Sequence, residues 1–99
     1  MKLWIDDCRP APDGYVWLQT VYDAVVEIMR CRNDNKEIEL IDIDHDAGDC
    51  AKYGGDYINL LNWLEYNGFN YPIRIHSQNP VGVENMRRII QKNGWREVK

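Results

Sequence analysis

The chain has 99 residues, which allows one compact domain over residues 1–99, and its 44% hydrophobic residues and four tryptophans suffice for a core. A net charge of −4 argues against an extended nucleic-acid surface and against attraction to anionic membranes. No apolar run approaches the ~20 residues of a membrane span and no signal peptide precedes the first expected strand, so we expect a cytoplasmic protein.

The first half of the chain predicts two short strands and a helix. Residues 2–6, KLWID, are an apolar run ending in acids, as in a buried strand. After the loop CRPAPDG, YVWLQ at 15–19 predicts a second strand. Its place in the sheet stays open, because the intervening crossover is too short for a helix. Thr20 and Asp23 then form a capping pattern for a helix that runs to about residue 31. The expected buried positions of that helix are Ala24, Val25, Ile28 and Met29.

The second half of the chain alternates strands with helices. Strands are expected at 38–44, 71–77 and, as a final edge strand, 95–99. A glycine-rich loop at 47–55 leads into a helix from about 56 to 67, and Asn79-Pro80 opens another helix that Gly94 ends. This order predicts an α/β fold of three layers, with helices on both faces of a small, mostly parallel sheet.

The stretch IDIDHDAG, at residues 41–48, is the most unusual feature of the sequence. Asp42, Asp44 and Asp46 occupy every second position, so they share one side of an extended chain at spacings of roughly 6.5–7 Å. Like charges that close raise one another's pKa or recruit a cation. Asp42 lies deeper in the strand, where neighbouring N–H groups or Arg74 are its expected partners.

Polar side chains follow three strands at what should be a single edge of the sheet. Asp6 and Asp7 end the first strand, Asp44 and His45 end the 38–44 strand, and His76 ends the next. Ligands of open parallel sheets bind outside the carboxyl ends of the strands. The sequence therefore predicts a site at this edge, where Asp6, Asp7 and Asp44 would hold a divalent cation such as Mg²⁺ or Mn²⁺.

An anion site is expected at the same edge, where Asn79 begins the last helix. Free N–H groups and the positive end of the helix dipole face the crevice there. Ser77 and Asn79 add donors, Gly82 lets a ligand approach the backbone, and Arg9 offers a cation for a phosphate. A phosphate ester would use the carboxylates, the N–H groups and the two imidazoles at once.

Three motifs resemble those of the cyclic-phosphate processing receiver-like domain family. They are WIDDCRPAP, DHDAG and HSQNPVGVENM, and the likeness extends from Leu3 to about Met86. The third motif matches closely from His76 on, whereas Ala47 stands where the family usually has leucine. The resemblance implies a flavodoxin-like, receiver-like sheet. It also implies action on cyclic phosphates produced in RNA repair, such as ADP-ribose cyclic phosphate.

Receivers use an acidic pair, an aspartate and a hydroxyl in the manner of Asp6, Asp7, Asp44 and Ser77. Their lysine has no counterpart, since Lys99 ends the chain, and two histidines are not part of their pattern. We therefore expect a hydrolase, a phosphoesterase that opens a cyclic phosphate on a small nucleotide-derived or RNA-terminal substrate. His45 and His76 would serve as general base and acid in either order, and a covalent route could use Asp44. The alternative is a non-catalytic phosphoacceptor or nucleotide-sensing module.

Overall fold

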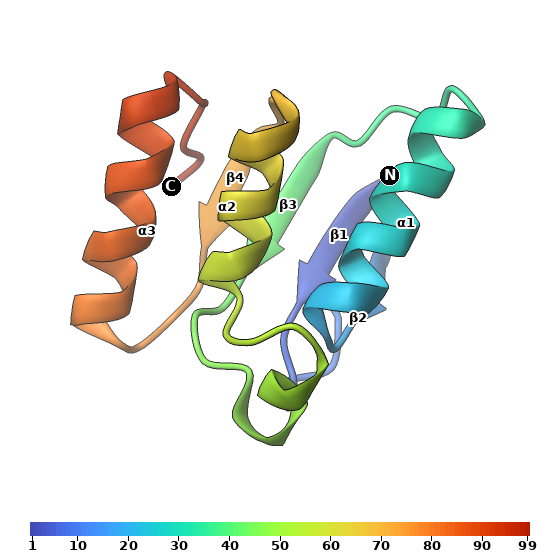
Figure 1. Cartoon of the computed structure of the whole chain (residues 1–99). Coiled ribbons are helices and arrows are strands. Elements are labelled where there is room, and N and C mark those ends of the chain that lie inside the picture. The colour runs from blue at the N-terminus through green and yellow to red at the C-terminus, as the bar shows by residue number, and fades with distance from the viewer.

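The computed structural model describes residues 1–99 and contains a four-stranded sheet in which every pairing is parallel. Its strands lie in the order β2-β1-β3-β4, with β1 at Lys2–Ile5, β2 at Tyr15–Leu18, β3 at Leu40–Ile43 and β4 at Ile73–Ile75. The helices are α1 (Val21–Asn33), α2 (Ile58–Asn67) and α3 (Pro80–Asn93) (Figure 1). The α/β class and the parallel, receiver-like sheet are confirmed, and β2 takes the edge beside β1.

All three helices cover the same face of the sheet, so the expected three layers are wrong and the fold has two (Figure 1). The helical crossovers from β2 to β3 and from β3 to β4 run in one direction across the sheet. Right-handed crossovers that run in one direction place their helices on one face. The β1–β2 crossover runs the other way, and a loop without a helix makes it. No helix therefore covers the second face of the sheet.

The core lies between the sheet and this single layer of helices. Side chains alternate along each strand, and the helix-facing set includes Leu3, Ile5, Ile41, Ile43 and Ile73, none of which is exposed. The helices contribute Ala24, Ile28, Leu60, Leu61, Leu64, Met86 and Ile90. At about 25 cal/mol per Å² of apolar surface removed from water, this burial is the main force that holds helices to sheet.

The other face of the sheet carries no helix and is polar and aromatic. The strands place on it Lys2, Trp4, Tyr15, Trp17, Leu40, Asp42 and Arg74. Of this set only Asp42 is fully buried. Because the first crossover holds no helix, this face stays partly open to solvent.

The structure differs from the sequence-based prediction in several smaller features, where tertiary contacts outweigh local patterns. The second helix begins at Ile58, because the 47–55 segment includes a 3₁₀ helix at Gly48–Tyr53 and two left-handed glycines follow. The expected edge strand at 95–99 is reduced to one bridge between Ile73 and Glu97. Met29 is exposed, whereas Glu27 is buried and paired with Arg30. None of the helices has the length and apolar character needed to cross a bilayer.

Candidate active site at the carboxyl edge of the sheet

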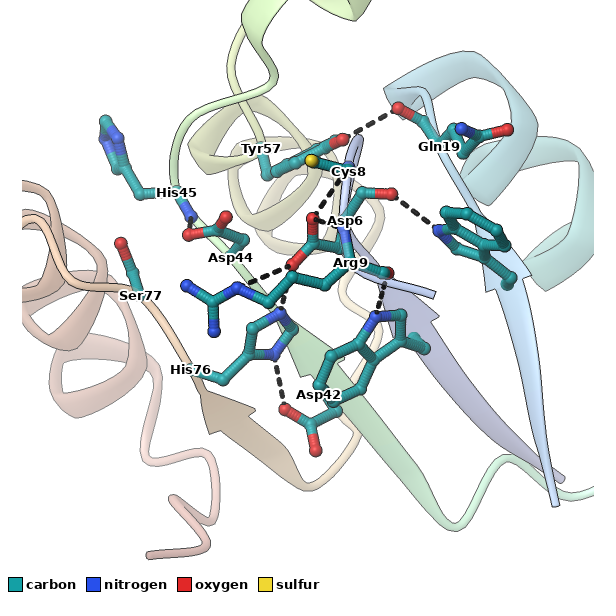
Figure 2. A network of polar contacts seen from close by, with 12 residues as sticks. Asp6, Cys8, Arg9, Gln19, Asp42, Asp44, His45, Tyr57, His76 and Ser77 are labelled. Atoms are coloured by element: carbon teal, nitrogen blue, oxygen red, sulfur yellow. Dashed lines mark hydrogen bonds and ion pairs between the residues drawn. The ribbon is translucent and has the colours of Figure 1, made fainter. Parts of the chain in front are cut away.

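His76 is the centre of a polar network that joins three strand ends. It follows β4, and its Nδ1 lies 2.7 Å from Asp42 Oδ1 while its Nε2 lies 2.9 Å from Asp6 Oδ2 (Figure 2). The ring also stacks on Trp4, with centroids 3.9 Å apart and planes 5° from parallel. With a carboxylate at each nitrogen, the ring donates two hydrogen bonds only as the imidazolium.

The charges of this network support one another. Burial alone would lower the pKa of His76, but its hydrogen bonds to Asp42 and Asp6 and their negative charges hold that pKa above its usual value. Burial would likewise raise the pKa of Asp6. The Arg9 and Cys8 amides and His76 outweigh burial, so the pKa of Asp6 lies below its usual value. His76 is thus suited to act as an acid rather than as a base near neutral pH.

The raised pKa of His76 predicts that the protein loses stability as the medium becomes alkaline. A histidine whose pKa is higher in the folded chain stabilises it fully below the unfolded pKa of about 6.5. This contribution is lost as pH rises through the folded value. We expect the melting temperature to fall from about pH 6.5 upward, and His76→Asn to flatten that slope. An equal slope in both proteins would contradict the assigned charge.

His45 occupies a separate position beside the start of α3. Its Nδ1 lies 2.7 Å from Asp46 Oδ1, and its Nε2 has no protein partner. A carboxylate at Nδ1 favours the tautomer that leaves the Nε2 lone pair free, the form that accepts a proton. His45 and His76 therefore differ in kind, one with a free nitrogen and the other with both nitrogens occupied.

Gly82 lies against the ring of His45, so a side chain occupies the space over this glycine that was expected for a ligand. A Cβ placed on Gly82 would overlap His45 Cγ. The Gly82 amide is also taken, since it donates to Asn79 Oδ1 at 3.0 Å. The glycine in the first turn of α3 thus serves to position the histidine.

We expect Gly82→Ala to lower turnover by displacing the His45 ring, although alanine is the better helix former. The ring is nearly buried and its Cγ cannot swing away as a flexible chain end would, so the melting temperature should not rise. A matched control is Gln91→Ala, on the exposed side of the same helix. Normal turnover with a raised melting temperature in Gly82→Ala would show that His45 adapts freely.

The row of three aspartates expected from IDIDHDAG does not form, because β3 ends at Ile43. Asp42 turns to His76, Asp46 turns to His45, and Asp44 Oδ1 accepts the His45 backbone N–H. Acids still gather at this edge. Burial first, and then the charges of Asp6, Asp44 and Asp46, raise the pKa of Asp7.

The residues expected to hold a cation are only partly free to do so. Ligand atoms of Asp6, Asp44 and His76 lie within 4.8 Å of one another. Asp6 is already occupied by two amides and His76, and a protonated His76 is not a ligand. Mg²⁺ keeps most of its water and takes one or two protein carboxylates, and Asp7 and Asp44, whose charges interact, are the acids of the expected set that His76 does not occupy.

Some of the residues expected to bind phosphate are engaged in hydrogen bonds within the protein, and others keep free donor groups. Asn79 caps α3 and its amide group reaches Asp46 at 3.3 Å, so its side chain is occupied. Ser77 Oγ accepts the Asn79 N–H and keeps its own proton to donate. The Arg9 side chain is about half exposed, with its Nε 4.0 Å from Asp6 Oδ2, and in Figure 2 its guanidinium points toward the side of Ser77 and Asp44.

Sequence reasoning missed the partners that orient the two histidines. Asp42 and Asp46 are those partners, and Trp4 supports the His76 ring. The register of β3 and β4 pairs Asp42 with Arg74, two residues before His76 and on the same face, so a known register would have placed Asp42 beside His76.

Sequence reasoning also did not single out Tyr57. It is fully buried, donates to the Gln19 carbonyl at 2.7 Å, and ties the start of α2 to the end of β2.

This edge is an open surface, since the three hollows of the protein are lined by other residues. The largest, of about 620 Å³, lies at the opposite edge of the sheet beside Arg32, Lys36 and Tyr71. Comparison with models of protein families gives a match over most of the chain. The family model described as cyclic-phosphate processing receiver domain covers residues 1–92. No curated protein and no solved structure matches the chain.

Proposed function

The chain belongs to the cyclic-phosphate processing receiver domain family, and from that premise we propose that it is a phosphoesterase that opens a cyclic phosphate on a nucleotide-derived or RNA-terminal substrate. The observation that carries the proposal is the pair of unlike histidines at one sheet edge. His45 has a free nitrogen and an orienting carboxylate, and His76 is held protonated between two carboxylates. Hydrolysis of a cyclic ester needs one base and one acid.

In the proposed reaction His45 Nε2 removes a proton from a water molecule that attacks the phosphorus. The bond from phosphorus to one ring oxygen then breaks, and that oxygen takes a proton, which leaves a phosphate monoester and a free hydroxyl. His76 is the suited donor, because its carboxylates keep it protonated. The Nε2–H of His76 donates to Asp6 Oδ2 at 2.9 Å, so transfer of its proton to the substrate requires that this hydrogen bond break.

The phosphate oxygens would be held by the groups left free at this edge. These are the Ser77 hydroxyl, the Arg9 guanidinium and the Val81 amide, which has no intrahelical acceptor in the first turn of α3. Donors aimed at oxygens that gain charge in the transition state accelerate the reaction more than they strengthen substrate binding.

A phosphoacceptor role is the less favoured alternative. Lys99 pairs with Glu97 at 3.2 Å rather than with an acid of the site. Asp44 is available as a nucleophile, but the carboxylate beside it that receivers keep for a metal, Asp6, is here occupied by His76. The unlike histidines therefore favour turnover.

A divalent cation, where one is used, would be held by Asp7 and Asp44 and would neutralise charge on the phosphate oxygens. Because these acids raise the pKa of Asp7, a cation that binds them should stabilise the folded chain. We expect millimolar Mg²⁺ or Mn²⁺ to raise the melting temperature, and Asp44→Asn to reduce that rise, whereas Asp13→Asn, an exposed loop control, should not. No shift, with activity that survives EDTA, would remove the cation from the proposal.

The direct test is incubation of the protein with a panel of cyclic phosphates, with and without EDTA, followed by phosphorus NMR. The panel needs a nucleoside 2′,3′-cyclic phosphate, an RNA oligonucleotide with a terminal cyclic phosphate, and ADP-ribose cyclic phosphate. Conversion of any of them to a phosphate monoester, abolished in the double variant His45→Ala and Ser77→Ala, supports the proposal. Binding without conversion would favour the sensing role, and neither binding nor conversion would end both.

A further inference from the structure

The open face of the sheet carries a group of aromatic and cationic side chains, here called the aromatic face. It consists of Trp4, Tyr15, Trp17, Lys2 and Arg74. Trp17 is 39% exposed, an unusual state for the largest apolar side chain. Trp4 and Tyr15 are partly exposed and meet edge to face, with centroids 5.9 Å apart.

The polar atoms of both indoles are already satisfied within the protein. Trp4 Nε1 donates to the Arg9 carbonyl at 2.9 Å, and Trp17 Nε1 donates to the Asp6 carbonyl at 2.7 Å. These bonds fix the rings against the loop that follows β1. What remains for an outside partner is ring surface, which recognises flat apolar or aromatic groups by stacking.

The exposed charges on the aromatic face are positive, although the chain as a whole carries −4. Lys2 and Arg74 are exposed, and Asp42, the one acid on this face of the strands, is fully buried. Lys2 Nζ lies 5.5 Å from the Tyr15 ring centroid, and Arg74 is held 3.7 Å from Asp42 Oδ2. Fixed aromatic rings beside cations match a partner that combines flat bases with phosphates.

The aromatic face is continuous with the candidate active site. Trp4 stacks directly on His76, and the Asp6 carbonyl that holds Trp17 belongs to the residue that holds His76 Nε2. From this continuity and from the charges we propose that the aromatic face binds a nucleobase of the substrate, so that the substrate is a nucleotide or an RNA end rather than a base-free cyclic phosphate. The inference rests on the proposed function, because it takes the carboxyl edge as the position of the cyclic phosphate.

Hydrolysis rates on substrates with and without a base test this inference. We expect kcat/KM to be higher for adenosine 2′,3′-cyclic monophosphate than for glycerol 1,2-cyclic phosphate. Trp17→Leu and Tyr15→Leu should each lower the nucleotide value by about 5- to 150-fold, the usual effect of losing one stacked ring. Tyr15→Leu leaves the Trp17–Asp6 bond intact, and Tyr22→Leu, an exposed tyrosine on α1, is the matched control. An RNA trinucleotide with a terminal cyclic phosphate, compared with the mononucleotide, tells whether the bound base is the terminal one or an upstream one.

The outcomes separate this inference from the proposed function. Equal rates on the two cyclic phosphates, or equal effects of Tyr15→Leu and Tyr22→Leu, would overturn base binding and leave the phosphoesterase intact. If neither compound is hydrolysed, the proposed function fails, and tryptophan fluorescence decides base binding alone. Quenching by the cyclic nucleotide that Trp17→Leu removes would support it, and no quenching would overturn it. A dimer in sedimentation that Trp17→Leu dissociates would instead assign the face to a second copy.

Discussion

Replacing His76 with alanine is expected to lower the free energy of unfolding by about 3–5 kcal/mol, the usual result of removing one partner from a buried charge cluster. Asp6 and Asp42 are 1% and 0% exposed, and without the imidazolium their nearest cations are Arg9 and Arg74, at 4.0 and 3.7 Å, beyond hydrogen-bonding distance. A small domain has about 5–15 kcal/mol in total, so the loss is a large share. Urea unfolding, read as a change in midpoint at constant slope, measures it.

The charge itself is tested by a double-mutant cycle with Asp42→Asn. His76→Gln should destabilise the wild-type protein more than the Asp42→Asn variant. In that variant one of the two carboxylates that lose their imidazolium partner has already been replaced by a neutral amide. His45→Ala is the matched control, since its partner Asp46 is 61% exposed and stays hydrated when the ring is lost. Equal losses in both backgrounds would mean that stacking on Trp4, rather than charge, makes His76 important.

His45→Ala is expected to lower turnover on a cyclic phosphate by about 10²–10⁴, the range for losing a general base, with little change in the melting temperature. His45 offers a nitrogen free of protein partners, and its ring lies against Gly82 in the first turn of α3, where the Val81 amide is proposed to hold the phosphate. The measurement is single-turnover conversion followed by phosphorus NMR. Added imidazole should restore part of the rate, because the space beside Gly82 is left empty by the missing ring.

Asp46→Asn separates orientation from chemistry at the same position. This variant keeps a side chain of equal size beside Nδ1 but removes its charge, so the rate should fall less than in His45→Ala. Full activity of His45→Ala at neutral pH would assign the base to another group and make His45 a packing residue on Gly82.

The sequence predicted which residues follow the strands because strand ends are local features. Apolar runs that stop at Asp6, Ile43 and Ile75 follow from hydrophobic pattern alone, and parallel pairing then brings their ends to one edge. The helix caps at Thr20 and Asn79 were readable for the same reason, since each is a short-range hydrogen bond between a side chain and a nearby amide.

Layering and pairing could not be predicted in this way. The α/β order determined which elements form, but the number of layers depends on the direction of each crossover, and the short first crossover made that direction ambiguous. The expected helices on both faces were wrong for this reason. The aromatic face became visible only once the helices were known to lie together on the other side (Figure 1).

The sequence by itself determined which chemical groups this protein has at its sheet edge: acids, two histidines, a hydroxyl and a helix start. Only the tertiary structure decided which group meets which. It paired His76 with Asp42 and Asp6, and His45 with Asp46 and Gly82. The physical reason is that hydrogen bonds and charge interactions act over a few ångströms, and Asp6 and His76 are separated by 70 positions in the chain. Strand register and crossover direction bring them within that range, and local sequence patterns predict neither of these.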